Sequence, residues 1–96
     1  MWKKLEFNNG EKGSENGIII RDEEYKSSCR ITLEKCSKYY AITCGVYGVM
    51  VHTTFCDEKD STNIFETMKK ELAEFVEKET TEDEEIAFYC YFTSKY

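Results

Sequence analysis

The residues Asn63 to Lys78, NIFETMKKELAEFVEK, decide the fold of this chain because they form one strongly amphipathic pattern. Apolar side chains recur there at spacings of three and four residues, which places them on one face of an α-helix; they are Ile64, Phe65, Met68, Leu72, Phe75 and Val76. We expect the helix to begin after a capping residue, which is Asp60, Ser61 or Thr62, and to end near Lys78. A helix with one apolar face predicts a second layer against which it packs.

The segment before this helix, Tyr39 to Cys56, supplies that layer. It is apolar and rich in β-branched and aromatic residues, and it is much longer than a usual strand of about 5 to 6 residues. Two arrangements are open. If Gly45 to Gly48 is a turn, Tyr39–Cys44 pairs with Val49–Phe55 as an antiparallel hairpin, whereas a bulge at the glycines would leave one long twisted strand. We favour the hairpin.

Two further strands are predicted nearer the N-terminus. Residues Ile18 to Ile20 are β-branched and are followed by charged residues, so we expect a short strand there. In Cys29–Glu34 apolar and polar residues alternate, which places Cys29, Ile31 and Leu33 on one face and Arg30, Thr32 and Glu34 on the other. The first face is expected to lie in the core and the second in water.

The first seventeen residues carry weaker signals. Residues 8–17 contain three glycines and no hydrophobic residue, so they are expected to form a mobile loop or tail. Alternatively they form the turn of a hairpin whose edge strand is Trp2–Phe7, where Leu5 and Phe7 alternate with charged residues. We expect residues 1–17 to be partly flexible.

The last segment fits two structures. Thr81 and Glu84 have the spacing of a helix capping box. However, Ile86, Phe88, Cys90 and Phe92 alternate strictly with their neighbours, and a helix here would be apolar on all sides. We therefore expect residues 86–93 to form a strand, with a second helix as the alternative.

These elements predict one α+β domain spanning residues 1–96. It consists of an antiparallel sheet of four to five strands with one long amphipathic helix packed on one face. The chain is too short for two independent cores. No internal repeat or linker interrupts it.

Composition excludes several classes of partner. Thirteen Lys and Arg against nineteen Asp and Glu give a formal net charge of −6, and no basic stripe is present, so we expect no nucleic-acid binding. No apolar run approaches the roughly 20 residues of a membrane span, and no export signal follows the N-terminal lysines, so we expect a cytoplasmic protein. The odd number of cysteines, five, favours free thiols.

The residues most suited to chemistry are His52 and the cysteines. In the expected hairpin Cys44 lies opposite Val49, His52 opposite Ala41, and Cys56 close to Cys36. No Cys-x-x-Cys, phosphate-binding glycine loop or calcium loop occurs, so no cofactor or metal is expected. His52 is expected to sit on a half-buried strand and to bond to a Thr or to the backbone, and the cysteines to act as small core residues.

The sequence leads to two functional hypotheses. The first is a non-catalytic, intracellular protein-interaction or regulatory domain, with self-association through sheet edges or an aromatic face as one form of that interaction. The alternative is a small thiol-dependent enzyme or metal-binding protein that uses His52 with Cys44, Cys56 or Cys36.

Overall fold

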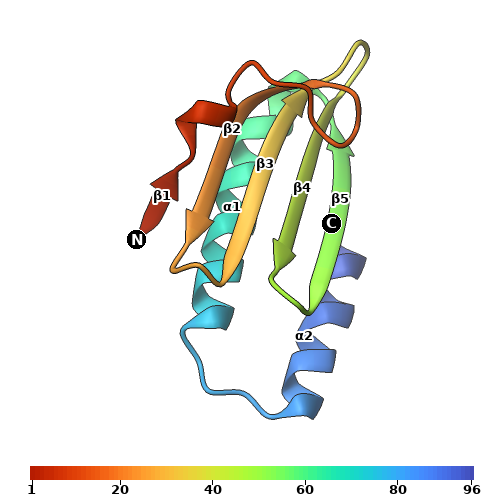
Figure 1. Ribbon diagram of the computed structural model, residues 1–96. Helices are drawn as coiled ribbons and strands as arrows, with labels where there is room; N and C mark the ends of the chain where they lie inside the picture. The colour runs from red at the N-terminus through yellow and green to blue at the C-terminus, as the bar shows by residue number, and fades with distance from the viewer.

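The computed structural model describes residues 1–96 as a five-stranded antiparallel sheet with two helices on one side (Figure 1). The strands lie in chain order across the sheet. They are β1 (Trp2–Lys4), β2 (Ile18–Tyr25), β3 (Cys29–Lys35), β4 (Tyr40–Val46) and β5 (Met50–Cys56), and the helices are α1 (Glu58–Val76) and α2 (Glu82–Lys95). A short 3₁₀ turn, Glu6–Asn8, follows β1. The expected α+β class with a helix on the sheet is confirmed.

The core lies between the sheet and α1. Its sheet side comes mainly from β3 and β4, which include the fully buried Ile31 and Ile42, and α1 contributes Phe65, Met68 and Leu72. The three helix residues follow the three- and four-residue spacing seen in the sequence. Their burial anchors the first half of the chain to the second.

The predicted strand at residues 86–93 is wrong, since these residues belong to α2. The capping box forms in full: the Thr81 hydroxyl accepts from the Glu84 amide, and the Glu84 carboxylate accepts from the Thr81 amide. Four acidic residues in the first turn, Glu82 to Glu85, also stabilise α2, because their negative charges lie at the positive end of the helix dipole. The apolar residues of α2 are buried to different extents: Phe92 lies in the core, while Ile86 and Tyr91 remain half exposed.

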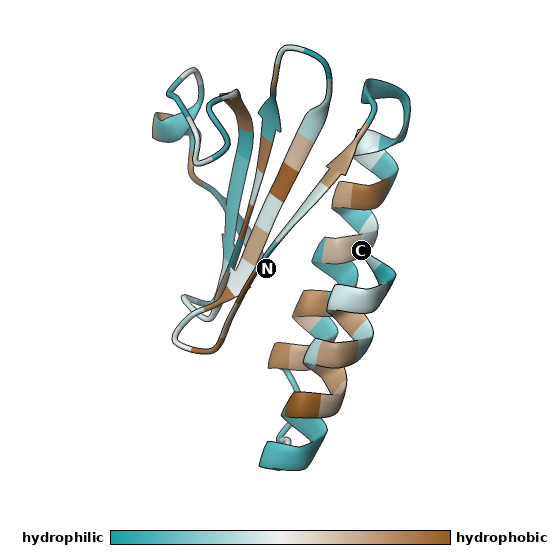
Figure 2. Cartoon of the chain, turned by 90° about the vertical axis from the view of Figure 1, so that its right-hand side faces the viewer, coloured by the Kyte–Doolittle hydropathy of each residue, from teal (hydrophilic) through white to brown (hydrophobic).

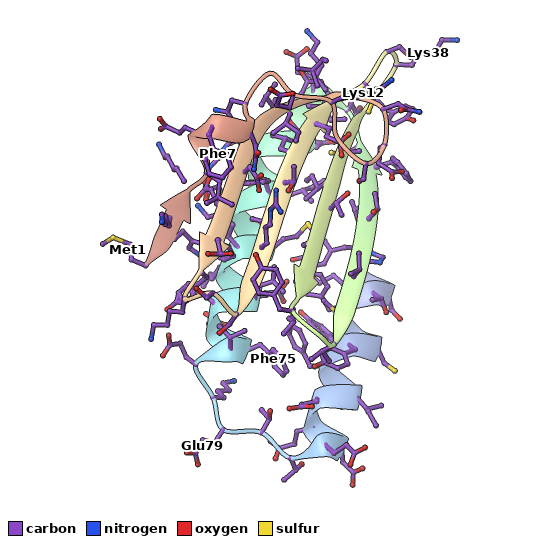
Figure 3. The ribbon with its side chains drawn as sticks, viewed as in Figure 1. Met1, Phe7, Lys12, Lys38, Phe75 and Glu79 are labelled. Carbon is purple, nitrogen blue, oxygen red and sulfur yellow. The ribbon has the colours of Figure 1, made fainter.

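The two helices meet beyond the end of the sheet. Phe75 of α1 stacks on Phe88 of α2 with ring centroids 4.1 Å apart, and Figure 3 places Phe75 below the strand ends, between the helices. Phe92 then continues the contact toward the sheet, with its ring 5.5 Å from that of Phe88. An aromatic cluster thus joins α2 to α1.

The hairpin of β4 and β5 forms as favoured, but its register differs from the expected one. The turn falls at residues 47–49, with a positive φ at Gly48, whereas Gly45 lies inside β4. A Cβ on Gly45 would approach the Met50 carbonyl oxygen to 2.6 Å, so this position in the strand favours glycine. Moving the turn places Cys44 opposite His52, and Ala41 opposite Phe55.

The segment before β2 folds onto the sheet face opposite the helices. Figure 2 shows the two helices on one side of the sheet and this segment on the other. The Gly10 amide donates to the Ile19 carbonyl, and the Ile19 amide donates to the Glu11 carbonyl. The expected edge strand shortens to β1, and the expected strand Ile18–Ile20 extends to Tyr25 despite its charged residues.

Candidate functional site

Cys44 and His52 are the two candidate residues that most nearly form the predicted pair of a thiol and an imidazole. They are directly opposed on β4 and β5, so both side chains lie on the face that the helices cover. Cys44 is only 2% exposed, and its burial raises the pKa of the thiol to about 12. His52 lies beside the Phe92 ring, and its Nε2 is 3.3 Å from the Thr54 hydroxyl. A protonated, covered thiol is a poor nucleophile.

The two other candidate cysteines, Cys36 and Cys56, do not join them. Cys56 pairs with Tyr40 at the far end of the same strands, while Cys36 lies after β3, where its Sγ faces the Glu15 carbonyl oxygen at 3.9 Å. Burial raises the pKa of each of these thiols. All five cysteines are free, and no three His, Cys, Asp or Glu side chains are grouped so that they could hold a metal ion.

The sheet face opposite the helices, which we call the open face, carries a dense polar network. Asp22 is 2% exposed and accepts four hydrogen bonds. Two come from the Arg30 guanidinium, at 2.9 and 2.5 Å, one from the Thr32 hydroxyl at 3.0 Å, and one from the side-chain Nδ2 of Asn8 at 2.7 Å. The network therefore ties β3 and the N-terminal segment to β2.

Glu34 lies on the same face and was expected in water, but it is fully buried. Segment 13–17 covers it. The Oε1 atom of Glu34 accepts hydrogen bonds from the backbone amides of Glu15 and Gly17, at 3.1 and 3.2 Å, whereas its Oε2 atom has no partner. A Cβ on Gly13 would lie 2.2 Å from the Glu34 carboxyl carbon, so Gly13 leaves the space that this carboxylate fills.

A cavity of about 700 Å³ extends along the open face. It runs from the N-terminal segment at residues 8–14, where Figure 3 marks Lys12, to the turn at residues 47–49. Its floor includes Arg30, Thr32, Glu34 and Thr43, and Gly45 adds no side chain to it. Apolar walls come from Ile19, Tyr47, Val49 and Val51. Volumes of this size are typical of small-molecule sites.

The two edges of the sheet differ sharply. β1 is three residues long and exposes Lys3 and Lys4, which are features that protect an edge against pairing. β5 is seven residues long, contains no Asp, Glu, Lys or Arg, and pairs with β4 without a bulge. No strand pairs with its outer side. Figure 1 shows this side of β5 at the right-hand boundary of the sheet.

Apolar side chains on the open face accompany that free edge. Val51 is 80% exposed and Phe55 56% exposed. The Phe55 ring packs edge-on against Tyr39, with centroids 5.2 Å apart, and Tyr39 is itself exposed. The sequence contained this signal in its uncharged run from residue 50 to 56, but only the strand order shows that the run forms an edge.

Comparison of the chain with protein-family models, with curated proteins and with solved structures gives no match. Neither helix is long and apolar enough to cross a membrane. The features of the molecule suited to binding are therefore the open face, its cavity and the β5 edge.

Proposed function

We propose that this chain is a non-catalytic, intracellular protein-interaction domain that pairs with a second copy of itself along the outer edge of β5. The observation that carries the proposal is the contrast between the two sheet edges. The β1 edge is short and charged, while the β5 edge is long, straight and uncharged. Unprotected edges of this kind present a row of backbone donors and acceptors to another strand.

Self-complementarity of β5 favours a second copy over an unrelated partner. If two β5 strands meet antiparallel with Thr53 at the two-fold axis, all seven residues find a partner. Val51 of one copy then lies opposite Phe55 of the other, and His52 opposite Thr54. Both apolar residues are exposed on the open face of the single chain, and cross-strand pairs of aromatic and β-branched side chains stabilise sheets.

Charge supports the same choice of surface. Two chains with a formal net charge of −6 each repel one another over most orientations. Pairing through β5 brings together strands that carry no acidic residue. The edge is thus a surface on which two acidic chains meet with little direct repulsion.

The intracellular assignment is part of this proposal. It is supported by five free thiols, one of which, Cys90, is exposed on α2. Free exposed thiols persist in reducing compartments, where disulfides are rare.

Sedimentation velocity over a concentration series tests the proposed pairing. Wild-type protein is expected to convert from monomer to dimer as concentration rises. Val51→Lys, at an exposed position where folding tolerates the change, should raise the dissociation constant at least about tenfold. Ile86→Lys, an equally polar change at an exposed position on α2, should leave it unchanged.

The Ile86→Lys control also distinguishes a dimer that forms through the β5 edge from one that forms through α2. A wild-type protein that stays monomeric at millimolar concentration would overturn the proposal. So would a dimer that Ile86→Lys disrupts and Val51→Lys does not, because that result places the contact on α2.

A further inference from the structure

We propose that the open-face cavity is a binding site for a small organic cation, a primary ammonium group on a short apolar body, whose charge is held by Glu34. The proposal does not rest on β5 pairing, since it concerns the floor of the cavity beneath segment 13–17, although Val51 of β5 contributes to the cavity wall. It rests on the only buried side-chain oxygen in the protein without a hydrogen-bond partner, Glu34 Oε2.

Comparison of the three buried acidic residues shows what Glu34 lacks. Asp22 faces the Arg30 guanidinium, and Glu23 is bonded by both Arg21 and Lys69, at 2.8 and 2.7 Å. Glu34 forms no ion pair and receives only two backbone amide hydrogen bonds, both on Oε1. Because a buried carboxylate requires compensation of its charge and of each oxygen, Glu34 is short of one cationic donor.

The cavity beside Glu34 has the shape and lining for such a donor. Its volume of about 700 Å³ accepts a small organic molecule. Its walls are formed by aliphatic and aromatic side chains, which suit the apolar body of the ligand. A primary ammonium offers three hydrogen-bond donors and no acceptor, which matches the unpartnered oxygen.

The other charged groups that line the cavity favour a cation over an anion. Arg30 is already bonded through two of its nitrogens to Asp22, so its charge is compensated. Glu11 and Lys12 stand exposed at the rim and offset one another. The uncompensated charge inside the cavity is therefore that of Glu34.

Segment 13–17 acts as the cover of this site. It closes over Glu34 through the amides of Glu15 and Gly17, and the Gly13 amide donates to the Gly17 carbonyl within the segment. Oε2 is covered in the closed form, so the cover must shift for the ammonium group to reach it. The NMR signals of the Glu15 and Gly17 amides should therefore report directly on whether a ligand is bound in the cavity.

The test is an amide NMR titration of the full chain with three probes that share a phenylethyl body: 2-phenylethylammonium, the neutral 2-phenylethanol and the slightly larger, anionic 3-phenylpropanoate. The ammonium probe is expected to produce saturable shifts of the Glu15 and Gly17 amides, and the other two are expected to bind at least about tenfold more weakly, as loss of a charge-assisted hydrogen bond implies. Equal binding of the alcohol, or no saturable shift with the ammonium, would overturn the proposal.

Three variants locate the charge. Glu34→Gln keeps an oxygen for the two amides but removes the negative charge, and it should weaken binding of the ammonium at least about tenfold. Lys12→Gln, at the rim, should strengthen binding slightly and Glu11→Gln should weaken it slightly, each by less than about threefold because exposed charges act through screening solvent. Should Glu34→Gln fail to fold, a Lys12→Gln variant that binds the ammonium more weakly still contradicts the assignment.

Discussion

Cys44 and His52 face each other across β4 and β5 on the covered side of the sheet. This is the geometry that the thiol-enzyme hypothesis needs, yet α1 and α2 cover it, and Cys44 is 2% exposed. A substrate would have to displace a helix to reach the sulfur atom. The pair therefore fits a packing role better than a catalytic one.

Alkylation rates test this difference. Cys90, which is exposed on α2, should react first at neutral pH. Cys29 and Cys44 should react only on unfolding, since burial raises the pKa of their thiols to about 11 and about 12. His52→Ala should leave the Cys44 rate unchanged in mass-resolved labelling. Fast labelling of Cys44 that is lost in His52→Ala would restore the enzyme hypothesis.

A pair of threonine substitutions tests the helical structure of the C-terminal segment. Thr81→Ala removes the cap of α2 and should lower the free energy of unfolding by about 0.5–2 kcal/mol in urea titrations. Thr93→Ala, at an exposed position within α2, should be neutral or slightly stabilising because Ala is the better helix former. A strand at residues 86–93 would reverse the second result, since Thr is the better strand former.

Glu71 predicts how stability depends on pH. Burial opposes its ionisation, but hydrogen bonds from Tyr91 and Lys95 of α2, and from Tyr96 just after α2, outweigh burial and lower the pKa of Glu71 below its ordinary value of 4.5. A lowered folded-state pKa stabilises the protein above pH 4.5 and ceases to do so as pH falls through the folded value. Glu71→Gln should therefore cost about 1 kcal/mol at pH 7 and less at pH 3.

Chemical denaturation across that pH range provides the measurement. Glu74→Gln, on the exposed side of the same helix, is the matched control and should change little at either pH. On the alkaline side, burial and the bond to Glu71 raise the pKa of Tyr96 to about 12. Stability should thus also decline as pH rises from 10 to 12. A difference between wild type and Glu71→Gln that grows on acidification would refute this account of α2 docking.

The Asp22–Arg30 pair predicts an asymmetry between its two members. Asp22 has a fully buried side chain, whereas that of Arg30 is 41% exposed. Arg30→Ala leaves a buried charge without its cation and should cost about 3–5 kcal/mol. Asp22→Ala should cost less because Arg30 can turn into water, and the double variant should recover part of the Arg30→Ala loss. Equal losses of stability in Arg30→Ala and Asp22→Ala, measured by thermal unfolding, would contradict this prediction.

Periodicity predicted the elements that bury one face. The spacing of Phe65, Met68 and Leu72 located α1, and the alternation in Cys29–Glu34 located β3, because each pattern reflects a local geometry. The same alternation rule failed for α2. There, Phe92 is buried while its neighbours are exposed or half exposed, and the local capping signal of Thr81 and Glu84 was the better guide.

The hairpin register and the candidate sites depend on contacts that the sequence pattern does not encode. A small shift of the turn, from Gly45–Gly48 to residues 47–49, changed the residue opposite His52 from Ala41 to Cys44. Glu34 occupied a position expected to be in water, and only the folding of segment 13–17 over the sheet buries it. The burial of Glu34 thus depends on a contact between residues that are far apart in the chain.

The central claim, that two β5 edges pair, is tested most directly by a proton NOE between the methyl groups of Val51 and the ring of Phe55. Within one chain these residues are four positions apart on a strand, or about 13 Å, which is beyond the reach of an NOE. In the proposed dimer they lie opposite each other on the same face. We expect the NOE at millimolar concentration, from isotope-filtered spectra of mixed labelled and unlabelled protein. Its absence from a wild-type sample that sediments as a dimer would contradict the β5 pairing.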